Sequence, residues 1–299
     1  MVGPFLLLLS AWLCVAPVAA LAEGCADAFA EGRRPEIINP KLAERAVPLC
    51  YEAFAVLHSG LSRTPLYAAE RLTRDSVAAA RRVDRIDAFH DEDALPVADR
   101  ARLDDYARSG YDRGHMAPAG DMPTGVAQAQ SFSLANIVPQ DRALNRGLWA
   151  AIEESVRRLA TRRGTLYVVT GPIYSGEAVQ VINGRVLVPT QLFKALYDPA
   201  TGEAGAYLMA NQDNPPWQAV SLDTLRTVSG LDVFPMLVPT AKVRAMDLPE
   251  PRAYSRGEPE GDERPRRRAP ETDSFESWAK DQLHRALRRL WRDLMRAIF

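Results

Sequence analysis

The segment from Tyr111 to Pro118 (YDRGHMAP) places an aspartate, an arginine and a histidine within four residues. The chain has 4 histidines, and only His115 lies in a cluster of this kind. A histidine titrates near neutral pH without special tuning, so His115 suits a general base that takes a proton from water. Arg113 can stabilise negative charge on phosphoryl oxygens. The cluster fits phosphodiester hydrolysis, which also needs an oxygen ligand for a hard cation.

Asn145, Glu153 and Arg157 supply further polar groups at steps of four and eight residues, in a segment with helical periodicity. Such steps place side chains one above another on a helix ridge. The amide oxygen of Asn145 and the carboxylate of Glu153 suit Mg²⁺ and its waters, and they discriminate weakly against Mn²⁺. Arg157 can hold the Glu153 carboxylate or reach a phosphate. The alternatives are that Asn145 only caps the helix, and that Glu153 and Arg157 form only a solvated ion pair.

With these spacings, the chain resembles the DNA/RNA non-specific endonuclease family of ββα-metal nucleases, similar to secreted sugar-non-specific nucleases and endonuclease G. The DRGH motif is intact at residues 112–115, and an N-x-x-P-Q element lies at residues 136–140. The resemblance covers about residues 50–237. Its later pieces are VTGPIY, VPT followed by FK, and SGLDVFP, at residues 169–174, 188–194 and 229–235.

The resemblance implies a role for each matching residue. His115 activates the attacking water, Asn145 binds a single Mg²⁺ directly, and Glu153 orients metal-bound water. Arg113 and Arg157 stabilise the charge at phosphorus. The resemblance further implies that Asp112 and Asn136 position these groups, that DNA and RNA are the substrates, and that products carry 5′-phosphates.

A catalytically inactive nucleic-acid- or envelope-binding protein on the same fold is the alternative from another functional class. The intact histidine, asparagine, glutamate and two arginines argue against it, because a binding protein has no need for a general base. A serine hydrolase is excluded, since the sequence contains no G-x-S-x-G motif.

The elements around these residues predict an α+β fold. Apolar residues at helical spacing predict a helix over 144–159, and a buried strand is expected over 165–170, closed by Gly171 and Pro172. Two more helices are expected, a short one over 99–109 and one over 221–228 that is capped by Ser221 and ended by Gly230. Two hairpins are also expected, one over 179–189 with a two-residue Asn183-Gly184 turn and one that pairs 193–197 with 205–209. The resemblance adds the ββα-metal (His-Me finger) fold, with a central, mainly antiparallel sheet flanked by helices.

The first residues indicate export. An apolar stretch followed by Ala20-Leu21-Ala22 is typical of a signal peptide over residues 1–22, so the sequence predicts a secreted or periplasmic protein. An uncleaved membrane anchor is the alternative, although the apolar run is shorter than the ~20 residues that a span needs. Removal of the signal leaves Cys25 and Cys50, for which we expect one disulfide, with two unpaired thiols as the alternative.

Beyond the expected endonuclease domain (23–249), residues 250–272 are rich in Pro, Gly and charge and predict a disordered linker. Residues 273–299 predict a basic amphipathic helix, which could pack on the body or a second subunit, lie on a membrane surface, or follow a phosphate backbone. The net charge of the chain is −1. A nucleic-acid function must therefore depend on local sites rather than on overall charge.

Overall fold

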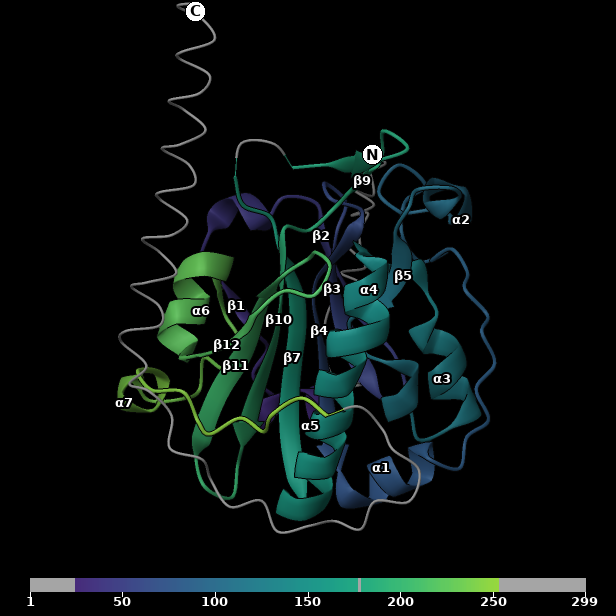
Figure 1. Ribbon diagram of the computed structural model, residues 1–299. Helices are drawn as coiled ribbons and strands as arrows, with labels where there is room; N and C mark the ends of the chain where they lie inside the picture. The colour runs from purple at the N-terminus through teal and green to yellow at the C-terminus, as the bar shows by residue number, and fades with distance from the viewer. Residues whose placement is uncertain (1–24, 177–178, 253–299) are drawn as a thin grey trace, which may run out of the picture. The chain divides into compact units, whose positions relative to one another are not determined.

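A seven-stranded sheet forms the centre of the computed structural model, which describes residues 25–176 and 179–252 (Figure 1). The strand order is β12-β11-β10-β7-β4-β3-β2, and every neighbouring pair is antiparallel. The strands are β2 (Ala46–Cys50), β3 (Phe54–Ser59), β4 (Thr64–Thr73), β7 (Thr165–Ile173), β10 (Gln191–Asp198), β11 (Glu203–Ala210) and β12 (Trp217–Val220). The sheet confirms the predicted α+β class.

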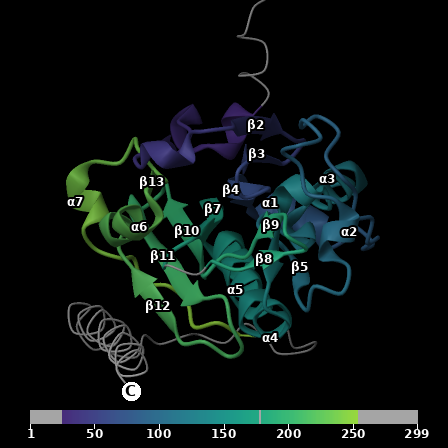
Figure 2. The same ribbon diagram turned by 90° about the horizontal axis from the view of Figure 1, so that it is seen from above.

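Both faces of the sheet are covered, so its strands carry buried side chains on both sides. In β10, Leu192 belongs to one core and its neighbour Phe193 to the other, as the twofold side-chain period of a strand requires. Helix α5 (Ala150–Arg163) covers the first face through Ile152, and α6 (Leu222–Ser229) covers the second through Leu225. Figure 2 shows these two helices on opposite sides of the sheet.

The remaining elements are short. The helices are α1 (Arg74–Ala80), α2 (Leu103–Tyr106), α3 (Gly125–Ser131), α4 (Arg142–Leu144) and α7 (Pro239–Lys242). Three two-stranded pairings join β1 (Glu36–Ile37) to β13 (Leu231–Asp232), β5 (Asp112–His115) to β6 (Ile137–Gln140), and β8 (Val181–Ile182) to β9 (Val186–Leu187). Single turns are η2 (Ala26–Ala28), η3 (Ala30–Gly32), η4 (Pro40–Leu42), η5 (Ala119–Asp121), η6 (Leu134–Asn136) and the π-helical η7 (Asn145–Trp149).

Several sequence predictions are confirmed. The helix expected over 144–159 is present as α4, η7 and α5, and the strands expected over 193–197 and 205–209 pair as β10 and β11. Helix α6 begins where the backbone N–H of Thr224 donates to the Ser221 hydroxyl, and it ends at Gly230, which has a φ of 73°.

Three boundaries were predicted wrongly. The helix expected over 99–109 contains only α2, because Ala107 is extended and Arg108 is left-handed, with a φ of 54°. Strand β7 continues through Gly171 to Ile173; Gly171 fits there because an added Cβ would lie 2.6 Å from the carbonyl oxygen of Leu66. The β8–β9 turn has three residues instead of two, since Ile182 pairs with Val186.

The expected disulfide is present between Cys25 and Cys50 and joins the N-terminal segment to the edge strand β2. None of the described helices is long and apolar enough to cross a membrane. The predicted signal peptide lies outside the described residues, as do most of the predicted linker and all of the C-terminal helix.

We expect that the combined substitutions Cys25→Ser and Cys50→Ser lower the free energy of unfolding by about 3 kcal/mol, because the crosslink restricts the unfolded chain. The sequence separation of the two cysteines is 25 residues. Urea unfolding of the oxidised wild type and of the double variant would measure the difference. Wild type held in dithiothreitol is the control and should resemble the variant; superimposable curves for all three samples would contradict the prediction.

Candidate active site

Strand β5 presents the DRGH motif in a two-stranded antiparallel pairing with β6. Asp112 pairs with Gln140, Gly114 with Val138, and His115 with Ile137. A Cβ atom on Gly114 would overlap the Gln140 side chain, so glycine is required for this close approach. Asp112 and His115, which are three residues apart, lie at opposite ends of this four-residue strand.

His115 is almost fully buried in an aromatic setting. Its ring meets Phe132 edge-on at a centroid distance of 4.9 Å, and Phe89 packs beside it at 5.3 Å. Burial, reinforced by the nearby positive charge of Arg85, lowers the pKa of His115 to about 3. The buried Nε2 atom has no hydrogen-bond partner within the described residues. His115 is therefore neutral at pH 7, the state in which it can accept a proton.

The loop that carries Phe89 is fixed to the protein body by Glu92. This carboxylate accepts hydrogen bonds from the hydroxyls of Tyr51, at 2.5 Å, and Ser133, at 2.7 Å. The backbone N–H of Leu134 also donates to the carbonyl of His90 at 2.9 Å. These contacts hold Phe89 against the His115 ring.

Asn136 lies in the interior behind His115. Its amide nitrogen donates to the carbonyls of Ala117 and Ser131 at 2.8 and 2.9 Å, and its amide oxygen accepts from the backbone N–H of Ala117 at 2.9 Å. These bonds fix the chain immediately after His115. Asn136 does not line the cleft, so the geometry fits a positioning role and not a contact with substrate.

Asn145 begins a π-helical turn between α4 and α5. Insertions of this kind occur often at functional sites. Its Nδ2 atom donates to the carboxylate of Asp112 at 3.1 Å, and because a carboxylate only accepts, this contact identifies which amide atom is the nitrogen. The amide oxygen accepts no hydrogen bond from the described residues and remains available to a ligand. The side chain that caps the N-terminus of α4 is that of Asp141, and the Asn145 side chain is directed to Asp112 instead.

Glu153 and Arg157 line the same cleft from α5. Burial raises the pKa of Glu153 to about 7, although the positive charges of Lys194 and Arg157 oppose this shift. Arg157 makes its ion pairs with Asp121, at 2.6 Å, and Glu154, at 3.0 Å. An ion pair between Glu153 and Arg157 is not among the contacts of the described residues, so the alternative of a simple solvated pair is not supported.

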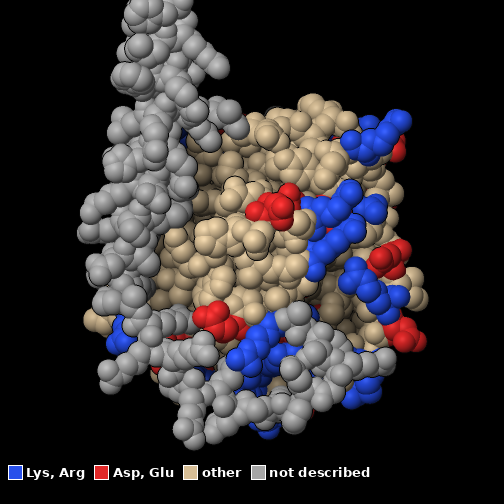
Figure 3. Space-filling model, viewed as in Figure 1, with Lys and Arg blue, Asp and Glu red and all other residues tan. Residues whose placement is uncertain are grey.

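These residues meet in one cleft with a volume of about 510 Å³. It brings together Asp112, Arg113, His115, Asn145, Glu153 and Arg157. A larger hollow of about 650 Å³ beside α6 contains none of them. Figure 3 shows blue Lys and Arg side chains gathered with red acidic ones toward the side of the molecule where β5 and α4 lie. The cleft therefore combines a neutral histidine, a free amide oxygen, a carboxylate and several guanidinium groups.

The donor set fits a hard divalent cation with few protein ligands. The described residues include no group of three or more His, Cys, Asp or Glu side chains placed to hold a metal. An amide oxygen from Asn145 with the nearby Glu153 carboxylate suits Mg²⁺, which usually keeps several waters and takes one or two protein oxygens.

Sequence reasoning missed several residues of the site. Arg85, Asp87 and Phe89 line the cleft, and the guanidinium of Arg113 lies 4.0 Å from the centre of the Phe89 ring. Beneath the cleft, Lys194 is 1% exposed and donates to the hydroxyl of Thr170 at 2.7 Å. The sequence did contain a signal for Lys194: it lies inside the apolar run of a buried strand, and a lysine is almost never fully buried without a partner.

A family model and several known proteins match this chain. The family model described as DNA/RNA non-specific endonuclease matches residues 36–239. "Nuclease 1, mitochondrial" of Schizosaccharomyces pombe is 33% identical over 197 residues, which are 58% of this chain and 61% of that protein. "Endonuclease G, mitochondrial" of Caenorhabditis elegans is 31% identical over 240 residues, 73% of this chain and 78% of that protein.

A solved structure has a similar fold. It is titled "Crystal structure of the EndoG/EndoGI complex: Mechanism of EndoG inhibition", and it aligns with a TM-score of 0.56 and 26% identity. The alignment covers 66% of this chain and 88% of that one. The ββα-metal fold class expected from the sequence is confirmed by this likeness.

The comparisons contradict the expected cellular location. The similar nucleases of fission yeast, worm, human and budding yeast all carry the word mitochondrial in their names. The expectation of a secreted or periplasmic protein was therefore wrong. It rested on an apolar N-terminal stretch, a feature of composition that lies outside both the described residues and the matched region.

The buried neutral state of His115 predicts a pH dependence of stability. In the unfolded chain His115 takes up a proton near pH 6.5, whereas in the folded protein it does so only at about pH 3. The contribution of neutral His115 to the free energy of unfolding is therefore fully present above pH 6.5 and is lost as the pH falls toward 3. In that pH range the free energy of unfolding of the wild type should rise with pH by up to about 1.4 kcal/mol per pH unit because of His115, and His115→Asn should remove this part of the slope. Urea unfolding of both proteins between pH 4 and pH 8 would test this; parallel profiles would show that His115 is not buried as a neutral group.

Proposed function

The chain belongs to the DNA/RNA non-specific endonuclease family and is an endonuclease, and on this premise we propose how its cleft hydrolyses DNA and RNA. In the proposal His115 is the general base, and Asn145 holds one divalent cation, Mg²⁺ or Mn²⁺. The observation that carries it is that a neutral His115, whose Nε2 atom has no hydrogen-bond partner among the described residues, meets the amide oxygen of Asn145 in one guanidinium-lined cleft.

His115 accepts the proton of the attacking water. Its low pKa in the absence of substrate keeps the ring unprotonated, and the negative charge of an entering phosphodiester opposes Arg85 and Arg113 and so favours the protonated ring. Phe89 and Phe132 exclude solvent from the ring and fix its plane. Asn136 holds the backbone after it, which maintains the position of the base.

Negative charge that builds up at phosphorus is stabilised by Arg113 and Arg157. Arg157 is held by two carboxylates, and Arg113 by its stacking on Phe89. A bound divalent cation would add Lewis-acid stabilisation of the phosphoryl and leaving oxygens. Glu153 orients water beside Asn145, and Asp112 fixes the Asn145 amide. Departure of the 3′ oxygen leaves 5′-phosphate products.

We expect His115→Ala to lower kcat on plasmid DNA and on RNA by roughly 10²- to 10⁴-fold, as for loss of a general base. EDTA should abolish both activities, and Asn145→Ala should raise the Mg²⁺ concentration that is needed for half-maximal rate. His90→Gln is the matched control, since His90 is exposed and does not line the cleft.

The outcome also separates the enzyme from a binding protein on the same fold. Folded wild type that binds DNA and RNA but leaves both intact over a range of divalent metals would refute the endonuclease. Metal-dependent cleavage that survives in His115→Ala would refute only the role of the base.

Asp121 should act on catalysis through Arg157. It is 3% exposed, and its Oδ1 atom lies 2.6 Å from the Arg157 guanidinium. Asp121→Asn keeps the size of the side chain but removes the charge, so we expect kcat to fall about tenfold with little change in KM. In an Arg157→Ala background the same change should add no further loss.

Asp198→Asn is the matched control, because Asp198 is also buried and pairs with an arginine, Arg163, but lies outside the cleft. It should lower stability without lowering kcat. Additive losses from Asp121→Asn and Arg157→Ala would contradict the coupling.

A further inference from the structure

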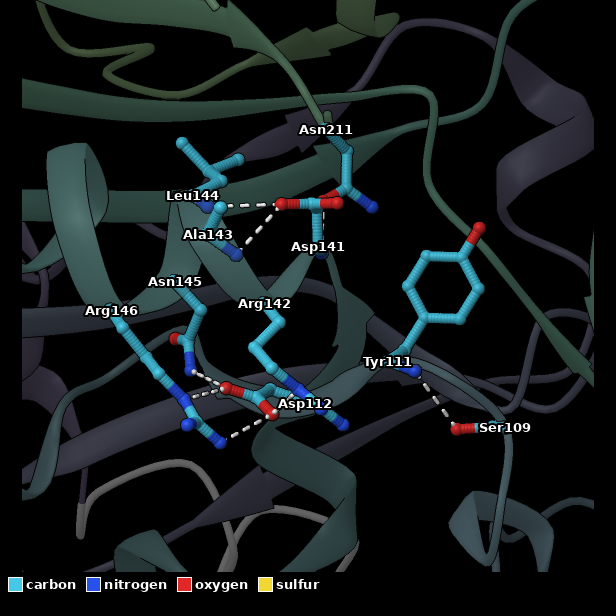
Figure 4. A network of polar contacts seen from close by, with 10 residues as sticks. All are labelled: Ser109, Tyr111, Asp112, Asp141, Arg142, Ala143, Leu144, Asn145, Arg146 and Asn211. Carbon is cyan, nitrogen blue, oxygen red and sulfur yellow. Dashed lines mark hydrogen bonds and ion pairs between the residues drawn. The ribbon is translucent and has the colours of Figure 1, made fainter. Parts of the chain in front are cut away.

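The carboxylate of Asp112 collects hydrogen bonds from three residues of the turn that leads into α5 (Figure 4). Arg142 donates from Nε at 3.2 Å, and Asn145 donates from Nδ2 at 3.1 Å. Arg146 donates from Nε at 2.8 Å and from Nη2 at 3.0 Å. One carboxylate is thus shared by two cations on either side of Asn145.

Both guanidinium groups keep unused donors. Arg142 uses only its Nε atom and Arg146 two of its nitrogens, and no other hydrogen bond of either group occurs within residues 25–176 and 179–252. The side chains are 59% and 67% exposed. The remaining N–H groups therefore face solvent, while Asp112 holds the guanidinium groups in place.

The neighbouring acid does not use these donors. Asp141 lies next in sequence to Arg142, but its carboxylate caps α4 by accepting from the N–H groups of Ala143 and Leu144 at 2.9 and 3.0 Å. Its own backbone N–H donates to Asn211 at 2.8 Å, which turns it toward the protein body. Among the described residues only Asp112 pairs with both guanidinium groups, so one negative charge is set against two positive ones.

Both arginines lie at the cleft or next to it, because both contact Asp112. Asp112, Asn145 and Arg146 line it, whereas Arg142 lies one turn earlier in the chain and outside it. A planar guanidinium with two free N–H groups matches the geometry of a phosphate diester, and Arg is favoured where phosphate is bound in this way.

We propose that Arg142 and Arg146 form a second phosphate-binding position, which takes a backbone phosphate of the polynucleotide next to the one being cleaved. The inference rests on the proposed function, because it places the scissile phosphate beside Asn145. Asp112 fixes the two guanidinium groups through the hydrogen bonds that it accepts from them. The DRGH aspartate thereby links the metal-holding amide to substrate binding.

Binding measured without cleavage tests the proposal. The probe is a fluorescein-labelled 20-base-pair DNA, titrated by anisotropy with the full chain in a His115→Ala background at several NaCl concentrations. Loss of a phosphate contact lowers the slope of log Kd against log salt concentration by about one. Arg142→Gln with Arg146→Gln should lower the slope by about one to two and weaken binding on the order of tenfold at 0.1 M salt.

Arg226→Gln with Arg244→Gln is the matched control, because it removes the same charge at two exposed positions outside the cleft. It should change the slope and Kd far less. Equal effects in both double variants would overturn the proposal, since they would show a general charge effect. An unchanged slope in the Arg142 and Arg146 variant would also overturn it.

The single variant Arg142→Gln distinguishes a loss of phosphate binding from a loss of local structure, because Arg146 and Asn145 still hold Asp112 in that variant. It should lower the slope by about one with an unchanged melting temperature. A slope that falls only together with the melting temperature would assign both arginines a purely structural role. The proposed function is tested separately by wild-type cleavage: a chain that binds with the predicted slopes but cleaves nothing refutes the enzyme and keeps the phosphate position.

Discussion

The hydrogen bond from the Asn145 amide to Asp112 joins two parts of the chain that are separate in sequence, the β5 strand and the start of the long helix. Since Asp112 and His115 share one strand, this contact also restricts the distance between His115, the proposed general base, and the amide oxygen of Asn145. The strand is held by β6 and the helix start by Asp141, whose backbone N–H reaches Asn211 after β11. The central sheet thereby positions both halves of the site.

Beneath the cleft, several charged side chains are buried between the sheet and α5. Glu70 is 2% exposed with neither carboxylate oxygen hydrogen-bonded in the described chain, and burial raises its pKa well above the ordinary range. Lys194 and Arg157 oppose that shift, whereas Asp121 and Glu153 reinforce it. Buried charges of this kind are costly unless they are paired. Their concentration beneath the cleft is therefore expected to lower the stability of this region.

The sequence alone predicted the positions of site residues that lie close together along the chain. Steps of four along a helix predicted that Asn145, Glu153 and Arg157 line one ridge, and capping residues predicted both ends of α6. It could not show that Arg157 pairs with Asp121, because η5 reaches α5 only through the folded sheet. Phe89 was missed for the same reason: its packing on His115 depends on a loop anchored by Glu92, a contact with no sequence period.

The near-zero net charge of the chain is compatible with a polyanionic substrate because electrostatic attraction is short-ranged in salt. At physiological ionic strength charges are screened over about 8 Å, so a backbone phosphate responds to the nearest side chains and hardly to the whole molecule. The arginines that line the cleft, Arg85, Arg113, Arg146 and Arg157, lie within one small volume. Each of the four is paired with a carboxylate or an aromatic ring, which fixes its direction before substrate arrives. Fixed guanidinium groups lose less conformational entropy on binding than mobile ones, so a few of them can bind a phosphate without a broad basic surface around them.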